Sequence, residues 1–287
     1  MYRTRWHMLD RVAEDCFEKG HRRMSVPGVQ GNALASAMAT LSEVQRWRRE
    51  EAAVFEGWDF SYLKDRASQD EPPWSYRDAA ANLIRAARHL LDVDTGGGEF
   101  LASLAPLPPA TKAIESYHPN VSLASSRLAA AGVEVSEVAH GAPWPFSDAS
   151  FDLILNRHSH LSVGEMSRTL RAGGTFFTQQ VASGNLADLI AAFGNTEAPS
   201  DNTLEATVGV LRGFGFEIIK GAEWSGHQSF HDVGALVYFL RAVPWVVRGF
   251  SVNSHLAILE HLDHKLRRDG VLTFSISRFM IEARKLA

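Results

Sequence analysis

The sequence predicts an α/β protein built on a doubly wound, mostly parallel sheet. From residue 79 onward, short apolar segments alternate with helical ones, and a run of three glycines directly follows the first apolar segment. At 287 residues and 45% apolar composition, the chain is large enough to bury a sizeable core. Strands separated by helices pair in parallel through right-handed crossovers. Such a sheet binds ligands outside the carboxyl ends of its strands.

The apolar periodicity predicts the elements of this sheet in order. The expected helices cover 79–88, 99–104, 120–131, 163–170 and 232–240, and the expected strands cover 90–94, 111–116, 134–139, 151–156 and 174–180. We therefore divide the chain into an N-terminal extension with flexible composition (1–37), a helical appendage or lid (38–73) and the main domain (74–287). The aromatic residues from Trp58 to Pro73 either cover a pocket or pack the appendage onto that domain.

Charge and cysteine content narrow the classes of partner. The net charge of −4 disfavours a surface that neutralises many phosphates, so nucleic acid is a minority interpretation. The single cysteine, Cys16, excludes an internal disulfide and fits a reducing compartment. The amino terminus lacks the apolar run of a signal peptide, and the apolar stretch 234–247 is too short to cross a bilayer. We expect a cytoplasmic protein without a membrane partner, whose oligomeric state the sequence leaves open.

The glycine run is the most informative segment. Glycines at 96–98 let the backbone approach a ligand closely, because they have no Cβ atom. Glu115 ends the next strand, 19 residues after Gly96, which is about the spacing of an acid that binds ribose hydroxyls. A dinucleotide site would need glycine where the chain has Leu101, so a nucleoside without a pyrophosphate is favoured. The alternative is a plain turn whose acid caps a helix.

Three motifs resemble those of class I S-adenosylmethionine (SAM)-dependent methyltransferases. Leu91–Glu99, with the sequence LDVDTGGGE, resembles their first SAM-binding motif. Pro143–Leu155 is similar to the stretch that leads into their fourth strand, and Arg168–Phe177 to the turn before their fifth. The resemblance covers residues 74–220. Residues 230–240 and 156–158 look like an uncharacterised bacterial branch, similar to methyltransferase type 11.

This resemblance implies a seven-stranded sheet with an antiparallel hairpin at one edge, SAM as the cofactor and S-adenosylhomocysteine as the product. The family usually has glycine where this chain has Asp94, and aspartate tolerates a left-handed backbone better than most residues. Carried over by position, the residues expected to contact SAM are Asp92, Asp94, Gly96, Gly97, Gly98, Glu115, Ser116, His140, Gly141, Ala142 and Asn156.

Chemistry is expected at the end of the fourth strand, where Asn156, Arg157 and His158 stand in sequence. Methyl transfer depends largely on positioning, and a histidine suits the removal of an acceptor proton near neutral pH. We predict His158 as the base, although it could instead cap a helix. Arg157 either orients an anionic acceptor or pairs with a carboxylate. The residues predicted to contact the acceptor are Trp74, Tyr76, Gln180 and Asp232.

Three functions remain open on sequence alone. Methyl transfer to an oxygen or nitrogen atom of a small molecule leads. An RNA methyltransferase is second, because the proline-rich approach to the fourth strand also resembles a branch that methylates ribosomal guanine. A non-catalytic SAM-binding protein is third, because of Asp94. A metal site is not expected, since His261 and His264 stand one helical turn apart without an evident third ligand.

Overall fold

The computed structural model describes residues 30–55, 58–196 and 201–287, which fall into two compact units, 1–45 and 46–287. Helix α2 (Gln30–Glu51) begins in the first unit and ends in the second. It starts before the helix predicted from residue 40, so residues 30–37 of the predicted extension are helical. The remainder of that extension lies outside the described residues, and the proposed domain boundaries stay a prediction.

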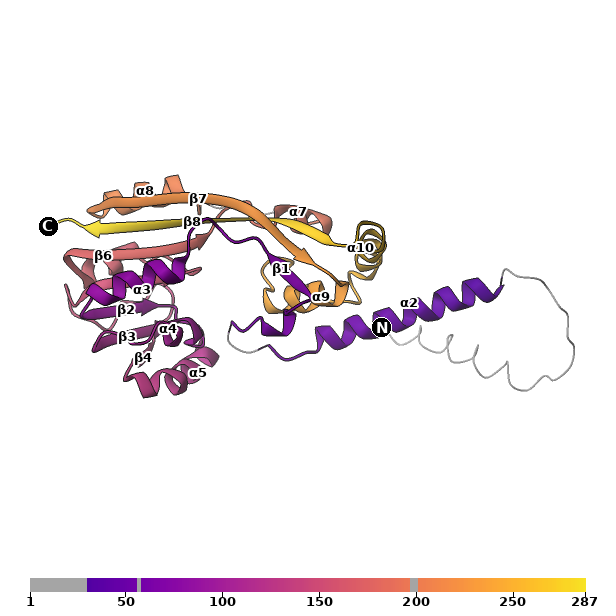
Figure 1. Cartoon of the computed structure of the whole chain (residues 1–287), viewed down its shortest axis with the longest axis horizontal. Coiled ribbons are helices and arrows are strands. Elements are labelled where there is room, and N and C mark those ends of the chain that lie inside the picture. Colours follow the sequence, from indigo (N-terminus) through magenta and orange to yellow (C-terminus); the bar gives the residue numbers. More distant parts are fainter. Residues whose placement is uncertain (1–29, 56–57, 197–200) are drawn as a thin grey trace, which may run out of the picture. The chain divides into compact units, whose positions relative to one another are not determined.

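The second unit contains one eight-stranded sheet, ordered β1-β7-β8-β6-β5-β2-β3-β4 (Figure 1). Its strands are β1 (Ala67–Gln69), β2 (His89–Val93), β3 (Ala110–Glu115), β4 (Glu134–Glu137), β5 (Phe151–Arg157), β6 (Leu170–Val181), β7 (Phe216–Phe230) and β8 (Leu272–Lys285). Strands β2 to β6 pair in parallel, whereas β8 is antiparallel to β6 and β7. The predicted α/β class and mostly parallel sheet are confirmed, and β1 adds an eighth strand beside β7.

The helices follow the strands closely. After α2 they are η1 (Ser61–Leu63), α3 (Tyr76–Ala86), α4 (Glu99–Ser103), α5 (His118–Leu128), η2 (Ala129–Ala131), α6 (Val163–Thr169), α7 (Ala187–Ala192), α8 (Leu204–Gly213), α9 (Val233–Ala242) and α10 (Leu256–Asp269). Side-chain caps begin several of them: the Ser75 hydroxyl accepts from Asp78 N before α3, and the Asp232 carboxylate accepts from Ala235 N before α9.

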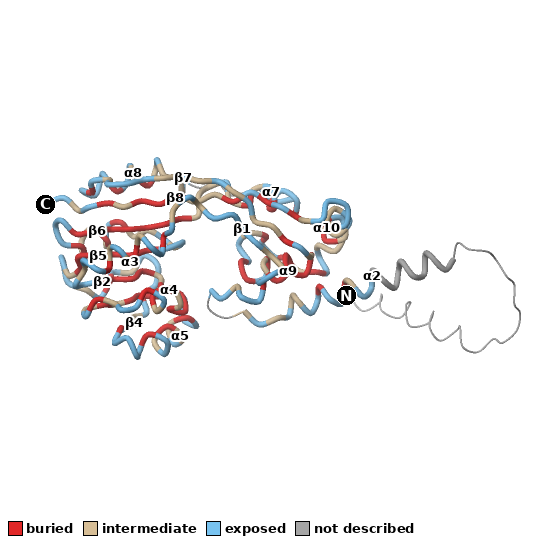
Figure 2. The backbone as a smooth tube through the Cα atoms, viewed as in Figure 1, coloured by how far each residue is buried: buried red, intermediate tan, exposed pale blue. Residues whose placement is uncertain are grey.

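The core lies on both faces of the parallel strands, which Figure 2 shows as largely buried. Successive residues of a strand point to opposite faces, so Leu90 and Leu91 enter different clusters. One cluster joins the sheet to α3, α4 and α5, through side chains such as Ile84, Leu101 and Leu128. The other joins it to α6 and α8, through side chains such as Met166 and Leu211. Helices on both faces make the sheet doubly wound.

Strands β7 and β8 continue beyond the parallel part of the sheet, where β1, α7, α9 and α10 accompany them (Figure 1). Their pairing runs from Phe216 opposite Lys285 to Phe230 opposite Leu272. Helices α9 and α10 connect the two strands, so the expected antiparallel edge is present but its connection is helical. Within the described residues, no helix is both long and apolar enough to span a membrane.

Candidate functional site

The candidate site lies at the carboxyl ends of the central parallel strands. The order of strands reverses between β2 and β5, because the chain continues from β2 to β3 on one side and returns to β5 on the other. Val93, near the end of β2, is opposite Asn156 in β5. A reversal of this kind leaves a crevice between the loops that follow the two strands. The glycine loop follows β2, and the predicted catalytic residues end β5.

The loop after β2 takes the left-handed backbone that its sequence predicts. The φ angle is +53° at Asp94, +64° at Gly96 and +80° at Gly98. Asp94 therefore adopts the conformation that glycine usually supplies at this position, which aspartate tolerates. At Gly98 an added Cβ atom would lie 3.0 Å from Leu128 Cγ, so glycine there also permits close packing of the loop on α5.

Glu115 connects the end of β3 to this loop. One carboxylate oxygen accepts a hydrogen bond from Gly96 N at 2.6 Å and the other accepts one from Tyr117 N at 2.7 Å. Burial raises the pKa of Glu115, while these backbone donors act in the opposite direction. The structure thus places Glu115 beside the glycine loop, as the spacing predicts. Its carboxylate ties the glycine loop to the end of β3.

Asp92 is a buried carboxyl under the same loop. Burial, together with the neighbouring carboxylates Asp94 and Glu115, raises its pKa to about 7, against the opposing effects of the nearby Thr95 hydroxyl and of Arg157. The Thr95 hydroxyl oxygen is itself buried. Three acidic groups around one glycine loop create a site that favours a cation with hydroxyl donors.

Two side chains cover the glycine loop. The position that a Cβ atom would take on Gly96 lies 2.6 Å from Trp58 Cδ1, so the indole rests directly on the loop. His140 Nε2 lies 3.4 Å from an Asp94 carboxylate oxygen and 2.8 Å from Ser116 Oγ. The cavity between these loops, lined by Val93 and Val138 among others, measures about 10 Å³. A cavity of this size is far smaller than a nucleoside.

His158 directly follows the last residue of β5. Its backbone is left-handed, with a φ angle of +57°, a strained conformation for a histidine. Its side chain is exposed to solvent, yet the surrounding protein, together with the guanidinium groups of Arg157 and Arg278, lowers its pKa well below the usual value. At neutral pH the imidazole is uncharged.

A chain of hydrogen bonds orients this imidazole. Trp74 Nε1 donates to Gln179 Oε1 at 2.8 Å, which directs the other end of the amide toward His158. Gln179 Nε2 lies 2.9 Å from His158 Nε2 and donates to it, since an amide nitrogen cannot accept. The neutral imidazole therefore carries its proton on Nδ1. Its Nε2 lone pair is occupied, so this geometry favours His158 as an orienting donor over the predicted role of a base.

Asn156, Tyr76 and Gln180 form a buried network behind His158. The Asn156 side-chain oxygen accepts from Gln180 Nε2 at 2.5 Å and from Thr178 Oγ1 at 3.1 Å. The Tyr76 hydroxyl donates to the Asn156 carbonyl at 3.1 Å, and its ring stacks on a neighbouring phenylalanine. All three predicted residues thus come together, but they support the crevice from within and do not line it.

Arg157 and Asp232 differ in their surroundings. The Arg157 guanidinium lies 4.9 Å from the centre of the Phe100 ring and 5.9 Å from that of Tyr76. Asp232, predicted to contact the acceptor, lies apart from this crevice. It accepts from Ala235 N at the start of α9 and binds Arg66 through both oxygens.

Of the other predicted positions, Gly141 follows His140 with a φ angle of +80°, and Ala142 packs on the adjacent core.

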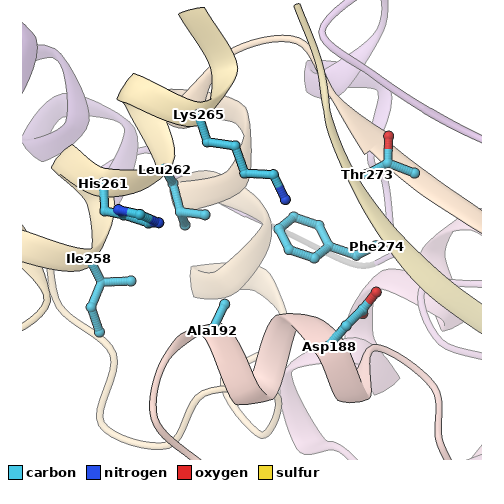
Figure 3. A pocket seen from close by; sticks show the side chains of 8 residues that line it. All are labelled: Asp188, Ala192, Ile258, His261, Leu262, Lys265, Thr273 and Phe274. Carbon is cyan, nitrogen blue, oxygen red and sulfur yellow. The ribbon is translucent and has the colours of Figure 1, made fainter. Parts of the chain in front are cut away.

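A larger cavity of about 240 Å³ lies elsewhere, between α7, α10 and β8 (Figure 3). Its walls are mostly apolar, with Lys265 and His261 from α10 at its edge. The Asp188 carboxylate faces it but is engaged by backbone and hydroxyl donors, including Ser275 N at 2.9 Å and Ser275 Oγ at 3.0 Å. In the described part of the chain, no three histidine, cysteine or acidic side chains are grouped as metal ligands.

Two residues of the site were missed by sequence reasoning. Trp58 belongs to the aromatic segment 58–73. Its contact with Gly96, 38 positions further along the chain, leaves no periodic signal in the sequence. Arg278, in β8, lies close enough to His158 to lower its pKa. The alternation of Leu272, Phe274 and Ile276 is a strand signal that could have located it.

Comparison with known proteins matches residues 91–178 to the family of methyltransferase domains. Among solved structures, a presumed methyltransferase from Bacillus halodurans is similar with a TM-score of 0.50 and 19% identity, over 73% of this chain and 100% of that one. The YcgJ protein of Bacillus subtilis is similar with a TM-score of 0.50 and 17% identity, over 74% of this chain and 98% of that one. At this identity the similarity shows the fold alone. No curated protein matches the chain.

Proposed function

We propose that this chain is a class I SAM-dependent methyltransferase, which transfers a methyl group from SAM to an oxygen or nitrogen atom of a small-molecule acceptor. The methyltransferase-domain match ends at Thr178, next to Gln179, and so spans the glycine loop, Glu115 and the end of β5. The observation that carries the proposal is the group of three carboxyls, Asp92, Asp94 and Glu115, around a left-handed glycine loop at the switch point of the sheet.

The chemistry of these groups fits SAM. Its ammonium and sulfonium are cations, which a carboxylate-rich loop stabilises, and its ribose hydroxyls donate to a carboxylate such as Glu115. When bound there, SAM supplies an electrophilic methyl group. The indole of Trp58 and the contact between His140 and Asp94 occupy part of this space. The Trp58 residue is 47% exposed and the His140 side chain 61%, so we infer that they swing aside and then cover the ligand.

The protein's own contribution would be to hold the acceptor in line with that methyl group. His158 projects from the end of β5 with its orientation set by Gln179 and Trp74. With Nε2 engaged, Nδ1–H is free to donate to an acceptor atom. Positioning of this kind accounts for much of the rate in a displacement reaction. An acceptor that is already deprotonated needs no base.

Calorimetric titration with SAM and with S-adenosylhomocysteine tests the proposal. We expect saturable binding of both and loss of about tenfold or more in affinity for Glu115→Ala, because a charged hydrogen bond is worth about 1.5–3 kcal/mol. Glu134→Ala is the matched control, since this glutamate lies on the next strand and pairs with Lys112 at the surface. Native protein that binds neither compound at millimolar concentration would contradict the proposed cofactor.

A second candidate is a protein that binds SAM without transferring its methyl group. It is favoured by the engagement of His158 Nε2 and of both Glu115 oxygens in internal hydrogen bonds. The two functions differ in turnover. Protein that binds SAM but transfers no labelled methyl group to any of a panel of hydroxyl, amine and carboxylate acceptors would support this second candidate.

A further inference from the structure

We infer that the crevice beside His158 binds an anionic acceptor, a carboxylate or a phosphate, through the guanidinium groups of Arg157 and Arg278. The inference rests on the proposed methyltransferase function and names the class of its substrate. It starts from two arginines that come from distant parts of the sequence and lie at one edge of the sheet.

The sheet register brings the two residues to this edge. Arg157 ends β5 opposite Gln179 of β6, and Arg278 in β8 is opposite Val181, two positions further along β6. Both positions belong to the carboxyl ends of the parallel strands, where doubly wound sheets bind their ligands. Gln179, the direct partner of Arg157 on β6, lies 2.9 Å from the His158 imidazole. The two cations therefore flank the imidazole that the proposed chemistry uses.

In the described part of the chain, neither guanidinium forms an ion pair with a carboxylate, although Asp92 acts on Arg157 and Glu71 on Arg278 from a longer distance. The Arg157 guanidinium lies over the rings of Phe100 and Tyr76. Arg278 donates to two uncharged acceptors, Asn185 Oδ1 at 2.5 Å and its neighbour's carbonyl, Ser277 O, at 2.8 Å. Arg278 is half-buried. A partly buried arginine is costly without a counter-ion, so this arrangement leaves a place for one.

The electrostatics agree with this geometry. Burial and then the nearby Arg157 guanidinium lower the pKa of Arg278 to about 10, against a smaller attraction from Glu71. Arg157 and Arg278 also both depress the pKa of His158. Two guanidiniums and a neutral histidine Nδ1–H together offer only donors. A carboxylate or phosphate satisfies them all, and guanidinium groups bind such oxyanions through paired hydrogen bonds.

An oxyanion could also come from SAM itself, through the carboxylate of its amino-acid part. Arg157 is the nearer candidate for that role, since it acts on Asp92 beneath the glycine loop. Arg278 comes from β8 and is opposite Val181, two positions further along β6 than the partner of Arg157. It is therefore the less suited of the two to bind the amino-acid part of SAM. The two sources therefore predict different patterns among single variants, and the experiment separates them.

The probe is inorganic phosphate, titrated into protein saturated with S-adenosylhomocysteine and followed by calorimetry and by the His158 imidazole resonances. We expect saturable binding that shifts these resonances and is weakened about tenfold or more in both Arg157→Gln and Arg278→Gln. Arg268→Gln is the control, because this exposed arginine pairs with Asp269 on α10. Arg278→Lys retains the charge and should keep most of the affinity, which separates a binding role from a loss of folding.

Unchanged phosphate affinity in both glutamine variants would overturn the inference. A second result would also overturn it, by assigning Arg157 to the carboxylate of SAM. In that case Arg157→Gln would bind S-adenosylhomocysteine more weakly but would bind phosphate normally. It would also keep its affinity for 5′-methylthioadenosine, which lacks the amino-acid part. If native protein does not bind S-adenosylhomocysteine, the proposed function fails, and phosphate titration of the free protein then tests the anion site alone. In that case, the same dependence on both arginines would support the anion site.

Discussion

Asp92 is a single buried carboxyl in the candidate site that lowers the stability of the folded protein at neutral and higher pH. Burial raises its pKa from 3.8 to about 7. The folded protein therefore holds the proton more tightly than the unfolded chain, so stability falls as the pH rises between these two values and remains lower above them. Each pKa unit corresponds to about 1.4 kcal/mol, which makes the total effect a few kcal/mol at most.

Asp92→Asn should therefore raise the melting temperature, and by more at about pH 8 than at about pH 5. The same variant should bind SAM more weakly, because it removes a carboxylate from the cation site. Thermal unfolding at the two pH values measures the first effect and calorimetry the second. Asp269→Asn, at an exposed ion pair, is the control. An equal change at both pH values would show that Asp92 is ionised throughout.

Trp74 controls the proton position on His158 from a distance. Its indole N–H fixes the Gln179 amide, which in turn donates to His158 Nε2. Trp74→Phe removes that N–H and lets the amide rotate, so the imidazole should become a mixture of its two neutral forms. Nitrogen NMR of the histidine rings reads this directly. Trp245→Phe, in which an exposed indole is replaced, should leave the spectrum of His158 unchanged. A single Nδ1–H form in Trp74→Phe would contradict this account.

At the scale of elements, the segment between α2 and β1 brings aromatic rings to the glycine loop. Trp58 contacts Phe55, Phe60 and Trp245, with ring centres 5.8 to 6.4 Å apart, while its edge rests on Gly96. SAM binding should move this indole and change its fluorescence. We expect a change on titration of native protein that is largely absent in Trp58→Phe and retained in Trp224→Phe, which lies on β7. An equal response in all three proteins would place the indole outside the ligand's path.

The last turn of α2, β1 and α9 meet at one arginine. Arg66 binds Glu50 at 2.8 Å and Asp232 at 2.8 Å, and all three groups are partly shielded from water. Arg66→Met would leave two carboxylates without their shared cation, so we expect a loss of about 1–3 kcal/mol in the free energy of unfolding, discounted for solvent screening. Urea unfolding measures it. The double variant Arg66→Met with Glu50→Gln should recover part of the loss, and no recovery would mean that packing, rather than charge, is involved. Arg85→Met is a surface control.

At the scale of the second unit, β7 and β8 connect the two ends of the sheet. The pairing of β7 with β8 extends from Ala283, beside the parallel strands, to Leu272, beside α10, with one register shift between Ile218 and Lys220. We therefore expect the two ends to unfold together. A ligand at 100 times its Kd adds about 2.7 kcal/mol to folding, and this gain should slow amide exchange near both residues. Hydrogen exchange with S-adenosylhomocysteine measures it. Slowing confined to the Ala283 end would indicate two separately unfolding regions.

Much of the parallel sheet was predictable because its signals are local. The predicted strand 90–94 corresponds to His89–Val93, and the predicted helix 163–170 to Val163–Thr169. Each follows from apolar periodicity within about ten residues and from capping or glycine residues at its ends. Strands β7 and β8 were not assigned, since β7 carries polar and charged residues along much of its length and makes its contacts across the sheet.

The sequence by itself determined the α/β class, the glycine loop and the acid that follows it, because these depend on spacing along the chain. Only the tertiary structure decided what each polar group does. It paired Asp232 with Arg66, placed Gln180 in the interior, set Trp58 on Gly96 and brought Arg278 to Arg157. These contacts join residues far apart in sequence, and their geometry depends on sheet register and on which hydrogen bonds burial leaves open.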